Sequence, residues 1–202
     1  MNSSPLMQLG ANLFSLALAL ALGWPAERIL LLYWAENVVV AFWQMPRILL
    51  AGKPPGGLPP LSNLFTSLFF LFHYGLFTLV HGMFVFQLFL HQKLTPETLA
   101  ANLGGVGMGL AVLGLLISHG VDFFQDLGSG RLATADAAKV MGEPYRRIVV
   151  LHLVVLGSGF LLTVLPYPQL ALVLLALVKT FMDLGLWQRR PQAAEEKNVA
   201  RI

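Results

Sequence analysis

The sequence contains no cysteine and few charged residues. Asp, Glu, Lys and Arg together make up 11% of its 202 residues, less than half of the share of about 25% that is usual for soluble domains. The absence of cysteine excludes disulfide bonds, thiolate metal ligands and cysteine nucleophiles. The shortage of charge means that little of the chain is suited to a water-exposed surface.

Hydrophobic residues dominate the composition. They make up 56% of the chain, and the mean hydropathy is +0.71, which excludes a soluble domain. The pI of about 9.5 is compatible with nucleic-acid binding, but the basic residues lie in loops at the ends of apolar segments, as in membrane proteins. We therefore expect membrane lipids as partners, no nucleic acid, and either a homo-oligomer or an association with another membrane protein.

The hydrophobic residues fall into six segments, each of a length that can form a membrane-spanning helix. The sequence predicts an all-α integral membrane protein, a six-transmembrane-helix bundle in which residues 1–187 form one domain and residues 188–202 a charged cytoplasmic tail. In the connections, Pro96 predicts the start of one short helix and Thr134 the N-cap of another. The predicted spans are residues 7–23, 29–50, 63–91, 103–124, 145–165 and 169–187.

The basic residues predict the orientation of this bundle. Six spans place both termini on one side of the membrane, and ten of the 13 Lys and Arg residues lie on that side. Arg28 and Lys93 lie on the other side, and Lys179 lies within the last span. The positive-inside rule therefore predicts that both termini are cytoplasmic. The ten residues are Arg47, Lys53, Arg131, Lys139, Arg146, Arg147, Arg189, Arg190, Lys197 and Arg201.

Four polar side chains within the spans predict a metal site in the cytoplasmic half of the bundle. His119 and Asp122, three residues apart, share a helix face, and His73 and His152 come from two other spans. Imidazole and carboxylate ligands from several helices are the donors of Zn, Fe or Mn sites in helical bundles. We expect all four residues to be ligands of one divalent metal ion.

Four further polar residues are candidates for catalysis or charge transfer. Glu36 and His81 are expected in the outer half of the membrane, as a second polar layer or a proton relay. Glu36-Asn37 is either a proton-accepting carboxylate or, through a bond to His81, a structural tie between the second and third spans. Lys179 and Asp183, four residues apart on the last span, are a neutralising pair or a catalytic acid and base.

Simpler structural roles are expected for many of the polar and aromatic residues. Each buried histidine can instead be a hydrogen-bonded strut, and the tryptophans and Tyr145 are expected to anchor or pack helices. Gly105 and Gly109 form a GxxxG pair that favours close approach of a neighbouring helix. Four phenylalanines are expected to face lipid or the core: Phe65, Phe69, Phe72 and Phe77.

Two motifs resemble a known family. Trp-x-Glu-Asn at residues 34–37, and His-Tyr-Gly-x-Phe at residues 73–77 followed by His81-Gly82, are similar to segments of a family of bacterial integral membrane proteins known as a domain of unknown function. The resemblance extends over the second to the sixth predicted span. It implies a multi-pass protein of the bacterial inner membrane and assigns no functional residue.

These observations leave four functional hypotheses. The first is a metal-dependent membrane enzyme that acts on a lipid-like or membrane-embedded substrate. The second is an ion or proton transporter or channel that uses Glu36, His81, Lys179 and Asp183 as charge-bearing steps. The third is haem b electron transfer with two histidines as axial ligands. The fourth is a non-catalytic accessory membrane protein.

Overall fold

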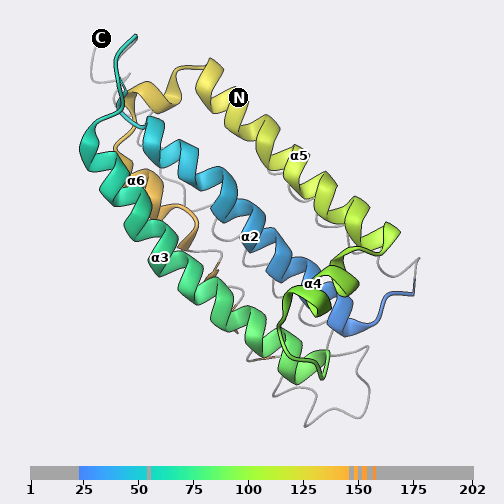
Figure 1. Cartoon of the computed structure of the whole chain (residues 1–202). Helices are drawn as coiled ribbons and strands as arrows, with labels where there is room; N and C mark the ends of the chain where they lie inside the picture. The colour runs from blue at the N-terminus through green and yellow to red at the C-terminus, as the bar shows by residue number, and fades with distance from the viewer. Residues whose placement is uncertain (1–22, 54–55, 146–147, 150–151, 154–156, 158–202) are drawn as a thin grey trace.

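The computed structural model describes residues 23–53, 56–145, 148–149, 152–153 and 157 (Figure 1). Within these ranges the chain is helical and contains no strand. The predicted spans at residues 7–23 and 169–187, with Lys179 and Asp183, and the tail at residues 188–202 lie outside the described residues. The predicted span at 145–165 is described at a few positions.

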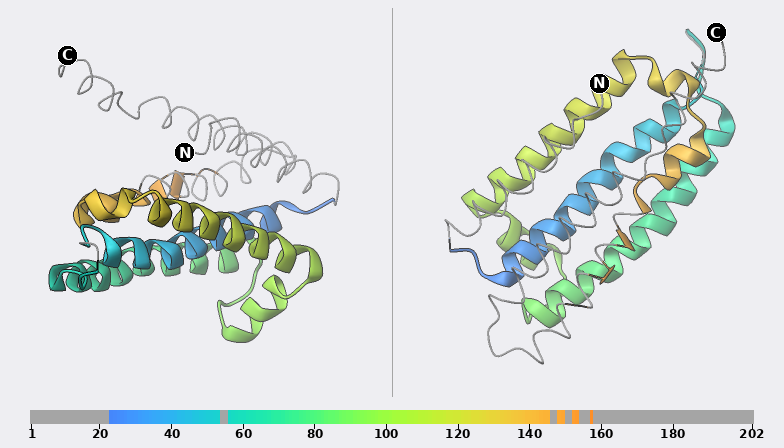
Figure 2. Two further views of the ribbon diagram at one scale, coloured as in Figure 1. Left: turned by 90° about the horizontal axis from the view of Figure 1, so that it is seen from above. Right: turned by 180° about the vertical axis from the view of Figure 1, so that it is seen from behind.

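Helix α2 (Ala26–Leu50) is the central element of the described structure. It begins directly after Pro25, which has no backbone N–H to leave unpaired at a helix start. Helices α3 (Leu61–Phe84) and α5 (Val106–Gly128) lie on either side of it (Figures 1 and 2). The interface of α2 with α5 carries one of the two groups of polar side chains discussed below.

Helix α3 runs antiparallel to α2 after a short connection. The side-chain amide of Asn63 donates hydrogen bonds to the backbone oxygens of Leu49 (3.2 Å) and Ala51 (2.7 Å), which satisfies carbonyl groups at the end of α2. At its other end α3 continues into η1 (Val85–Phe89), a single π-helical turn. The predicted span at 63–91 therefore corresponds to α3 and η1 together.

The short connecting helices begin at polar caps. Helix α4 (Pro96–Leu103) has Pro96 at its first position, as predicted, and a capping box formed by Thr95 and Thr98. It projects from one end of the bundle (Figure 2). After α5 come the 3₁₀ turn η2 (Arg131–Thr134) and helix α6 (Ala137–Gly142), which contacts both α2 and α3.

The predicted N-cap of the second short helix was wrong. Asp136, not Thr134, caps α6, because its carboxylate accepts the backbone N–H of Lys139 at 3.0 Å. Thr134 ends η2 and donates its hydroxyl to the backbone oxygen of Arg131. Both residue types favour the N-cap, and the 3₁₀ turn that precedes α6 decides which of them is in that position.

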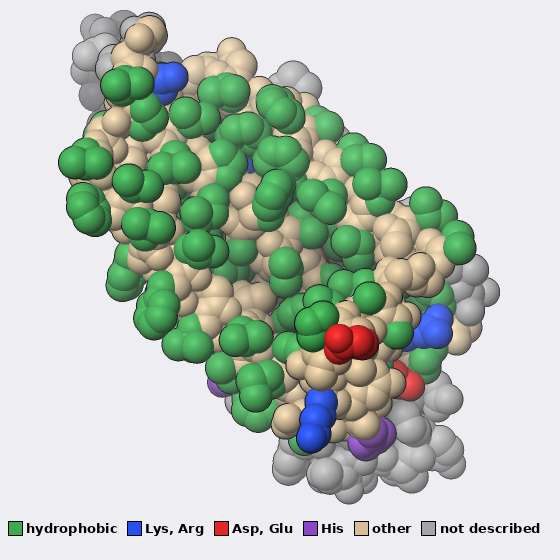
Figure 3. Space-filling model, in the orientation of Figure 1, with side chains coloured by type: hydrophobic (Ala, Val, Ile, Leu, Met, Phe, Trp, Pro, Cys, Tyr) green, Lys and Arg blue, Asp and Glu red, His purple; other side chains and the backbone are tan. Residues whose placement is uncertain are grey.

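Three described helical segments are long and apolar enough to cross a membrane: Glu27–Leu50, Leu61–Phe89 and Val106–Gly128. Hydrophobic side chains cover most of the face in Figure 3, and charged side chains gather toward its ends. The four phenylalanines singled out in α3 (Phe65, Phe69, Phe72 and Phe77) are all exposed, so they face outward rather than into the core. The length, composition and exposure of these helices indicate a membrane protein.

Two tryptophans of α2 each donate a hydrogen bond to the backbone of a neighbouring helix, next to a glycine of that helix. The indole N–H of Trp34 donates to the backbone oxygen of Thr78 in α3 at 2.7 Å, and that of Trp43 donates to the backbone oxygen of Leu116 in α5 at 3.0 Å. In each case a glycine follows four residues after the acceptor. A Cβ atom on Gly82 would lie 2.7 Å from Trp34, and one on Gly120 would lie 2.8 Å from Trp43.

The predicted glycine pair in α5 is not where the closest approaches occur. A Cβ atom on Gly105 would meet nothing within 4 Å, and one on Gly109 would meet only the backbone oxygen of Leu103, at 3.6 Å. Among the described residues, the tight helix contacts involve Gly82 and Gly120 instead. At both positions, the glycine lies four residues after the backbone carbonyl that accepts the indole N–H. The glycine therefore makes room for a tryptophan ring and not for the backbone of another helix.

Candidate functional site in two polar seams

Polar side chains line two helix interfaces, one between α3 and the segment that begins at Tyr145 and one between α2 and α5. We call the first the α3 seam, which comprises His73, Tyr145, His81 and His152. We call the second the α5 seam, which comprises Glu36, His119, Arg47 and Asp126. Each seam holds titratable groups inside segments that are otherwise apolar, where an unpaired polar group is costly.

Two hydrogen bonds define the α3 seam. Nδ1 of His73 lies 2.8 Å from the Tyr145 hydroxyl, and Nε2 of His81 lies 2.8 Å from Nδ1 of His152. Because His73 pairs with Tyr145 and His81 with His152, residues 145–152 run in the same direction as α3. The pairing of two imidazole rings connects two helical segments through titratable side chains alone.

The hydrogen bonds fix the tautomers that the His81–His152 pair adopts when both rings are neutral. Nδ1 of His81 lies 2.7 Å from the backbone oxygen of Phe77, which only accepts, so His81 carries its proton on Nδ1. Its Nε2 then accepts, and the N–H donor of the His–His bond is Nδ1 of His152. Nε2 of His152 is consequently the atom that can take up a further proton.

His73 is surrounded by aromatic rings. Its imidazole stacks on Phe69 with ring centroids 5.4 Å apart and meets Phe77 edge to face at 5.2 Å. The Tyr145 ring, which hydrogen-bonds His73, also packs edge to face on Phe70 and Tyr74. His73 therefore acts as a hydrogen-bonded strut, one of the roles expected from the sequence.

A buried bond between Tyr74 and Asn37 ties the α3 seam to α2. The Tyr74 hydroxyl donates to Oδ1 of Asn37 at 3.1 Å, and the Asn37 amide donates to the backbone oxygen of Tyr33 at 2.8 Å. A tie between the second and third spans is therefore present, but it joins Asn37 to Tyr74 and not to His81 as predicted. Glu36, the neighbour of Asn37, is directed toward α5.

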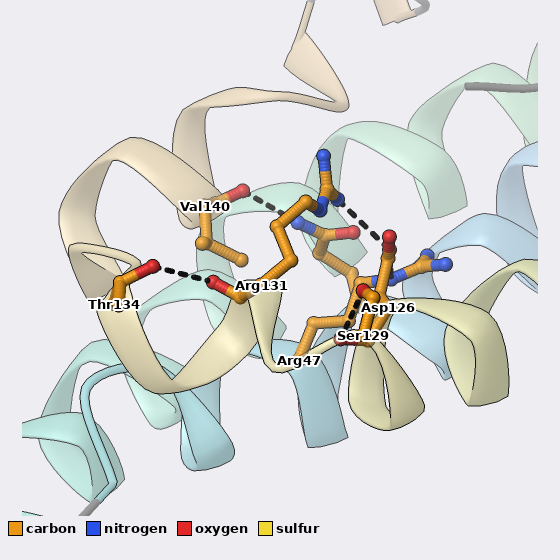
Figure 4. A network of polar contacts seen from close by, with 7 residues as sticks. Arg47, Asp126, Ser129, Arg131, Thr134 and Val140 are labelled. Atoms are coloured by element: carbon orange, nitrogen blue, oxygen red, sulfur yellow. Dashed lines mark hydrogen bonds and ion pairs between the residues drawn. The ribbon is translucent and has the colours of Figure 1, made fainter. Parts of the chain in front are cut away.

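Acidic and basic side chains approach each other at two places along the α5 seam. Oε1 of Glu36 lies 3.9 Å from Nε2 of His119, and both side chains are largely buried near the middle of their helices. Toward the end of α2, Oδ2 of Asp126 lies 3.3 Å from Nε of Arg47 and 2.8 Å from Nη2 of Arg131 (Figure 4). Asp126 therefore bridges a buried arginine of α2 and a more exposed arginine of η2.

The predicted division into an inner and an outer polar layer was wrong. His152 was expected beside His73 in the inner half, but it pairs with His81, because Tyr145 already lies level with His73, well along α3. Helix α6 packs against α2 and α3 at the end of the bundle where α3 begins. Tyr145 therefore lies further along α3 than the first residue of a span that begins at the membrane surface.

The same correction applies to the second pair of residues. His119 was expected in the inner layer and Glu36 in the outer, but their side chains lie 3.9 Å apart. The reason is that α5 begins at Val106 and continues to Gly128, beyond the predicted end of its span, so that His119 lies near mid-helix.

The four predicted metal ligands do not gather at one point. His73 contacts Tyr145, His152 contacts His81, His119 faces Glu36, and Asp122 acts on Arg47 electrostatically. In the part of the chain that the structure describes, no group of three or more His, Asp or Glu side chains is close enough to hold a metal ion. The predicted Zn, Fe or Mn site thus has no support there, and the haem b hypothesis stays a prediction.

Several partners were not anticipated from the sequence. Tyr145 was interpreted as an interface anchor or packing residue and proves to be the partner of His73. Arg47 was counted only as a positive charge at a span end, and Asp126 was not singled out. The signal was present in the sequence, since α2 and α5 each end with a charge of opposite sign, Arg47 and Asp126.

Comparison with known proteins supports the resemblance noted in the sequence. No curated protein and no solved structure matches the chain. A family model, described as a family of unknown function (DUF6498), matches residues 2–200. The match covers nearly the whole chain and is in agreement with the resemblance to an uncharacterised membrane family, so the protein belongs to the family of unknown function DUF6498.

Proposed function

We propose that the protein is a proton-translocating integral membrane protein of the bacterial inner membrane. In this proposal it has six spans and cytoplasmic termini, and protons pass along the α3 seam. The observation that carries the proposal is the direct His81–His152 hydrogen bond between two helical segments. An imidazole pair of this kind both accepts and donates protons at physiological pH.

The tautomers indicate how a proton would cross the pair. A proton that binds Nε2 of His152 makes that ring an imidazolium, and the ring then releases the proton on Nδ1 to Nε2 of His81. The positive charge is now on His81, whose Nδ1–H stays bound to the backbone oxygen of Phe77. Because a charged ring is costly in an apolar interior, the pair holds this charge only while a proton passes.

The His81–His152 pair is partly buried, which favours passing a proton on over holding it. His81 is 3% exposed, whereas His152 is among the exposed residues. His152 is thus the more accessible ring of the pair, and His81 is the ring enclosed within the bundle. The Glu36–His119 pair places a carboxylate and a further imidazole between α2 and α5.

Proton flux into liposomes tests the proposal. Purified protein is reconstituted with a pH-sensitive dye inside, and a potassium diffusion potential drives protons inward. We expect flux above that of protein-free liposomes, and at least about tenfold less with His81→Gln, because an amide cannot be protonated in this pH range. Flux that is absent with wild-type protein, or equal in the variant, would contradict the proposal.

His91 supplies the matched control. It is an exposed histidine outside the helices with φ of 53°, a left-handed conformation that asparagine tolerates. His91→Asn therefore makes the same kind of change, imidazole to amide, without touching either seam. We expect the flux of this variant to equal that of the wild type.

Elemental analysis of the same protein tests the metal-dependent enzyme that the sequence analysis favoured. Near-stoichiometric Zn, Fe or Mn that His152→Ala loses and His91→Asn retains would replace the proton-transfer proposal with a metal site. Such a site would need ligands from beyond the described residues, because that part of the chain brings no third ligand to His152.

A further inference from the structure

The end of the bundle nearest Tyr145 is closed by α6. This short helix contacts α2 and α3 where the two helices meet, and Val140 of α6 belongs to the apolar cluster that contains Ile48, Phe70 and Tyr74. Met141 and Tyr145 pack against the same cluster. The α6 segment therefore lies between the solvent at this end and the His73–Tyr145 pair.

Two kinds of contact hold α6 and the preceding turn against α2. The side-chain amide of Gln44 donates to the backbone oxygen of Val140, and the backbone N–H of Gly52 donates to the backbone oxygen of Leu132 at 2.8 Å. The Arg47–Asp126–Arg131 network then joins α2, α5 and η2 at the same level (Figure 4).

The two arginines of the ionic network differ in exposure. The Arg47 side chain is 11% exposed and lies over the Phe123 ring, with its Cζ atom 5.9 Å from the ring centroid, whereas the Arg131 side chain is 49% exposed. If Asp126 lost its charge, Arg47 would be a buried cation without this partner. An unpaired buried charge destabilises the packed state of α2 and α5, which favours a state in which water reaches Arg47.

An unpaired hydroxyl lies on the face of α3 that packs toward α6 through Phe70 and Tyr74. Ser67 is 1% exposed, on the face of α3 that carries Asn63, Phe70 and Tyr74, and its Oγ has no hydrogen-bond partner among the described residues. A buried hydroxyl of this kind binds water as soon as water reaches it. Along α3, Ser67 lies between the start of the helix and His73, one turn before Phe70, which shares an apolar cluster with Val140 of α6.

We propose that α6 is a gate over the α3 seam and that the Arg47–Asp126–Arg131 network is its lock. With the lock formed, Val140 and Met141 cover the apolar cluster against which Tyr145 also packs. When Asp126 releases Arg47, α6 moves away, and water reaches Ser67 and then the His73–Tyr145 pair. The inference rests on the proposed function only for what the gate admits, namely water and protons.

The chain has no cysteine, so a single introduced thiol reports access directly. Ser67→Cys places a thiol of nearly the same size on this face of α3, and its rate of reaction with a water-soluble maleimide measures how often the gate opens. We expect slow labelling in the otherwise wild-type chain. With Asp126→Asn added, labelling should be about tenfold faster or more.

Two further variants keep the test informative if Asp126→Asn folds poorly. Gln44→Met removes the donor to Val140 at constant charge and should also speed labelling, to a smaller extent. Glu97→Gln neutralises an exposed carboxylate of α4 at the opposite end of the bundle and should leave the rate unchanged.

Equal labelling rates in folded wild-type, Asp126→Asn and Gln44→Met backgrounds would overturn the gate, as would fast labelling in the wild-type background. Labelling does not depend on proton flux, so the two proposals fail separately. Loss of flux in His81→Gln with no response at Ser67 would retain the relay and reject the gate. The reverse pattern would retain the gate and reject the relay.

Discussion

At the scale of single residues, the two tryptophans of α2 determine how closely its neighbours can pack. Trp34 reaches a backbone oxygen of α3 because Gly82, four residues after that acceptor, leaves room for the indole ring. Trp43 uses Gly120 of α5 in the same way. An indole N–H that lacked this acceptor would be an unpaired donor in an apolar interface, which costs about 1–3 kcal/mol.

We therefore expect Gly82→Ala to destabilise the protein. The added Cβ atom would lie 2.7 Å from the Trp34 ring, so the ring or the helix must shift. Overpacking of this kind costs about 1–3 kcal/mol, which offsets or exceeds the gain of up to about 1 kcal/mol from replacing a glycine within a helix. The measurement is the thermal unfolding midpoint in detergent, followed by tryptophan fluorescence.

Gly75→Ala is the control on the same helix. A Cβ atom at Gly75 meets nothing within 4 Å, so only the helix propensity changes, and the midpoint should stay the same or rise. The packing argument would be wrong if the two alanine variants shifted the midpoint equally. The same comparison applies to α5, with Gly120→Ala as the test and Gly114→Ala as the control.

The residue scale is also where the sequence was least informative. His119 and Asp122 were grouped with His73 and His152 because their types match a metal site, but residue type does not determine which helix faces meet. The observed partners, such as Tyr145 for His73, depend on how far along α3 the next helical segment starts. That offset is set by α6 and its loop, which local sequence does not reveal.

At the scale of elements, the sequence predicted the helices well. The long apolar runs and their proline and glycine boundaries predicted α2, α3 and α5 to within a few residues at most ends, because a membrane-spanning helix needs about 20 apolar residues. The extension of α5 to Gly128 was missed, since Gln125 and Asp126 appeared to end the span. A span can end in polar residues when a partner such as Arg47 lies opposite.

Helix α6 provides a test at this scale. Asp136→Ala removes the side chain that accepts the backbone N–H of Lys139, and loss of an N-cap costs about 1 kcal/mol. We expect amide hydrogen exchange in α6 to be roughly fivefold faster, by the conversion of about 1.4 kcal/mol per factor of ten. Thr134→Ala, at the position that the sequence suggested as the cap, is the matched control.

These two variants separate the observed cap from the predicted one. Exchange that quickens in α6 with Thr134→Ala and not with Asp136→Ala would show that the helix begins earlier than described. Asp136→Ala should also speed the labelling of Ser67→Cys if α6 is a gate, because a loosened α6 opens more often. Unchanged labelling with quickened exchange would mean that α6 frays without exposing the seam.

At the scale of the whole molecule, the described helices alternate in direction. α2 and α3 are antiparallel, as the bonds from Asn63 to the end of α2 require. α5 is parallel to α2, since Trp43 meets Leu116 and Arg47 meets Asp126 in the same order along both chains. If these three segments span the membrane, α4 lies on one side of it, and α6 lies on the other.

The absence of native cysteine allows this topology to be read with single thiols. We expect Ser129→Cys, in the connection before α6, to be protected from an impermeant maleimide in intact cells and labelled once the cells are opened. Ala101→Cys, on the exposed side of α4, should be labelled in both states. This outcome follows from the excess of Lys and Arg on the side that holds α6.

Thiols near the two ends of the chain extend the same measurement to the number of spans. Ser3→Cys and Ala200→Cys should both behave like Ser129→Cys, because an even number of spans returns the chain to the side on which it started. If only one of the two end positions were labelled in intact cells, the number of spans would be odd. If Ser129→Cys and Ala101→Cys were labelled alike, α5 would not cross the membrane, and a route for protons along α2, α3 and their neighbours would lose its physical basis.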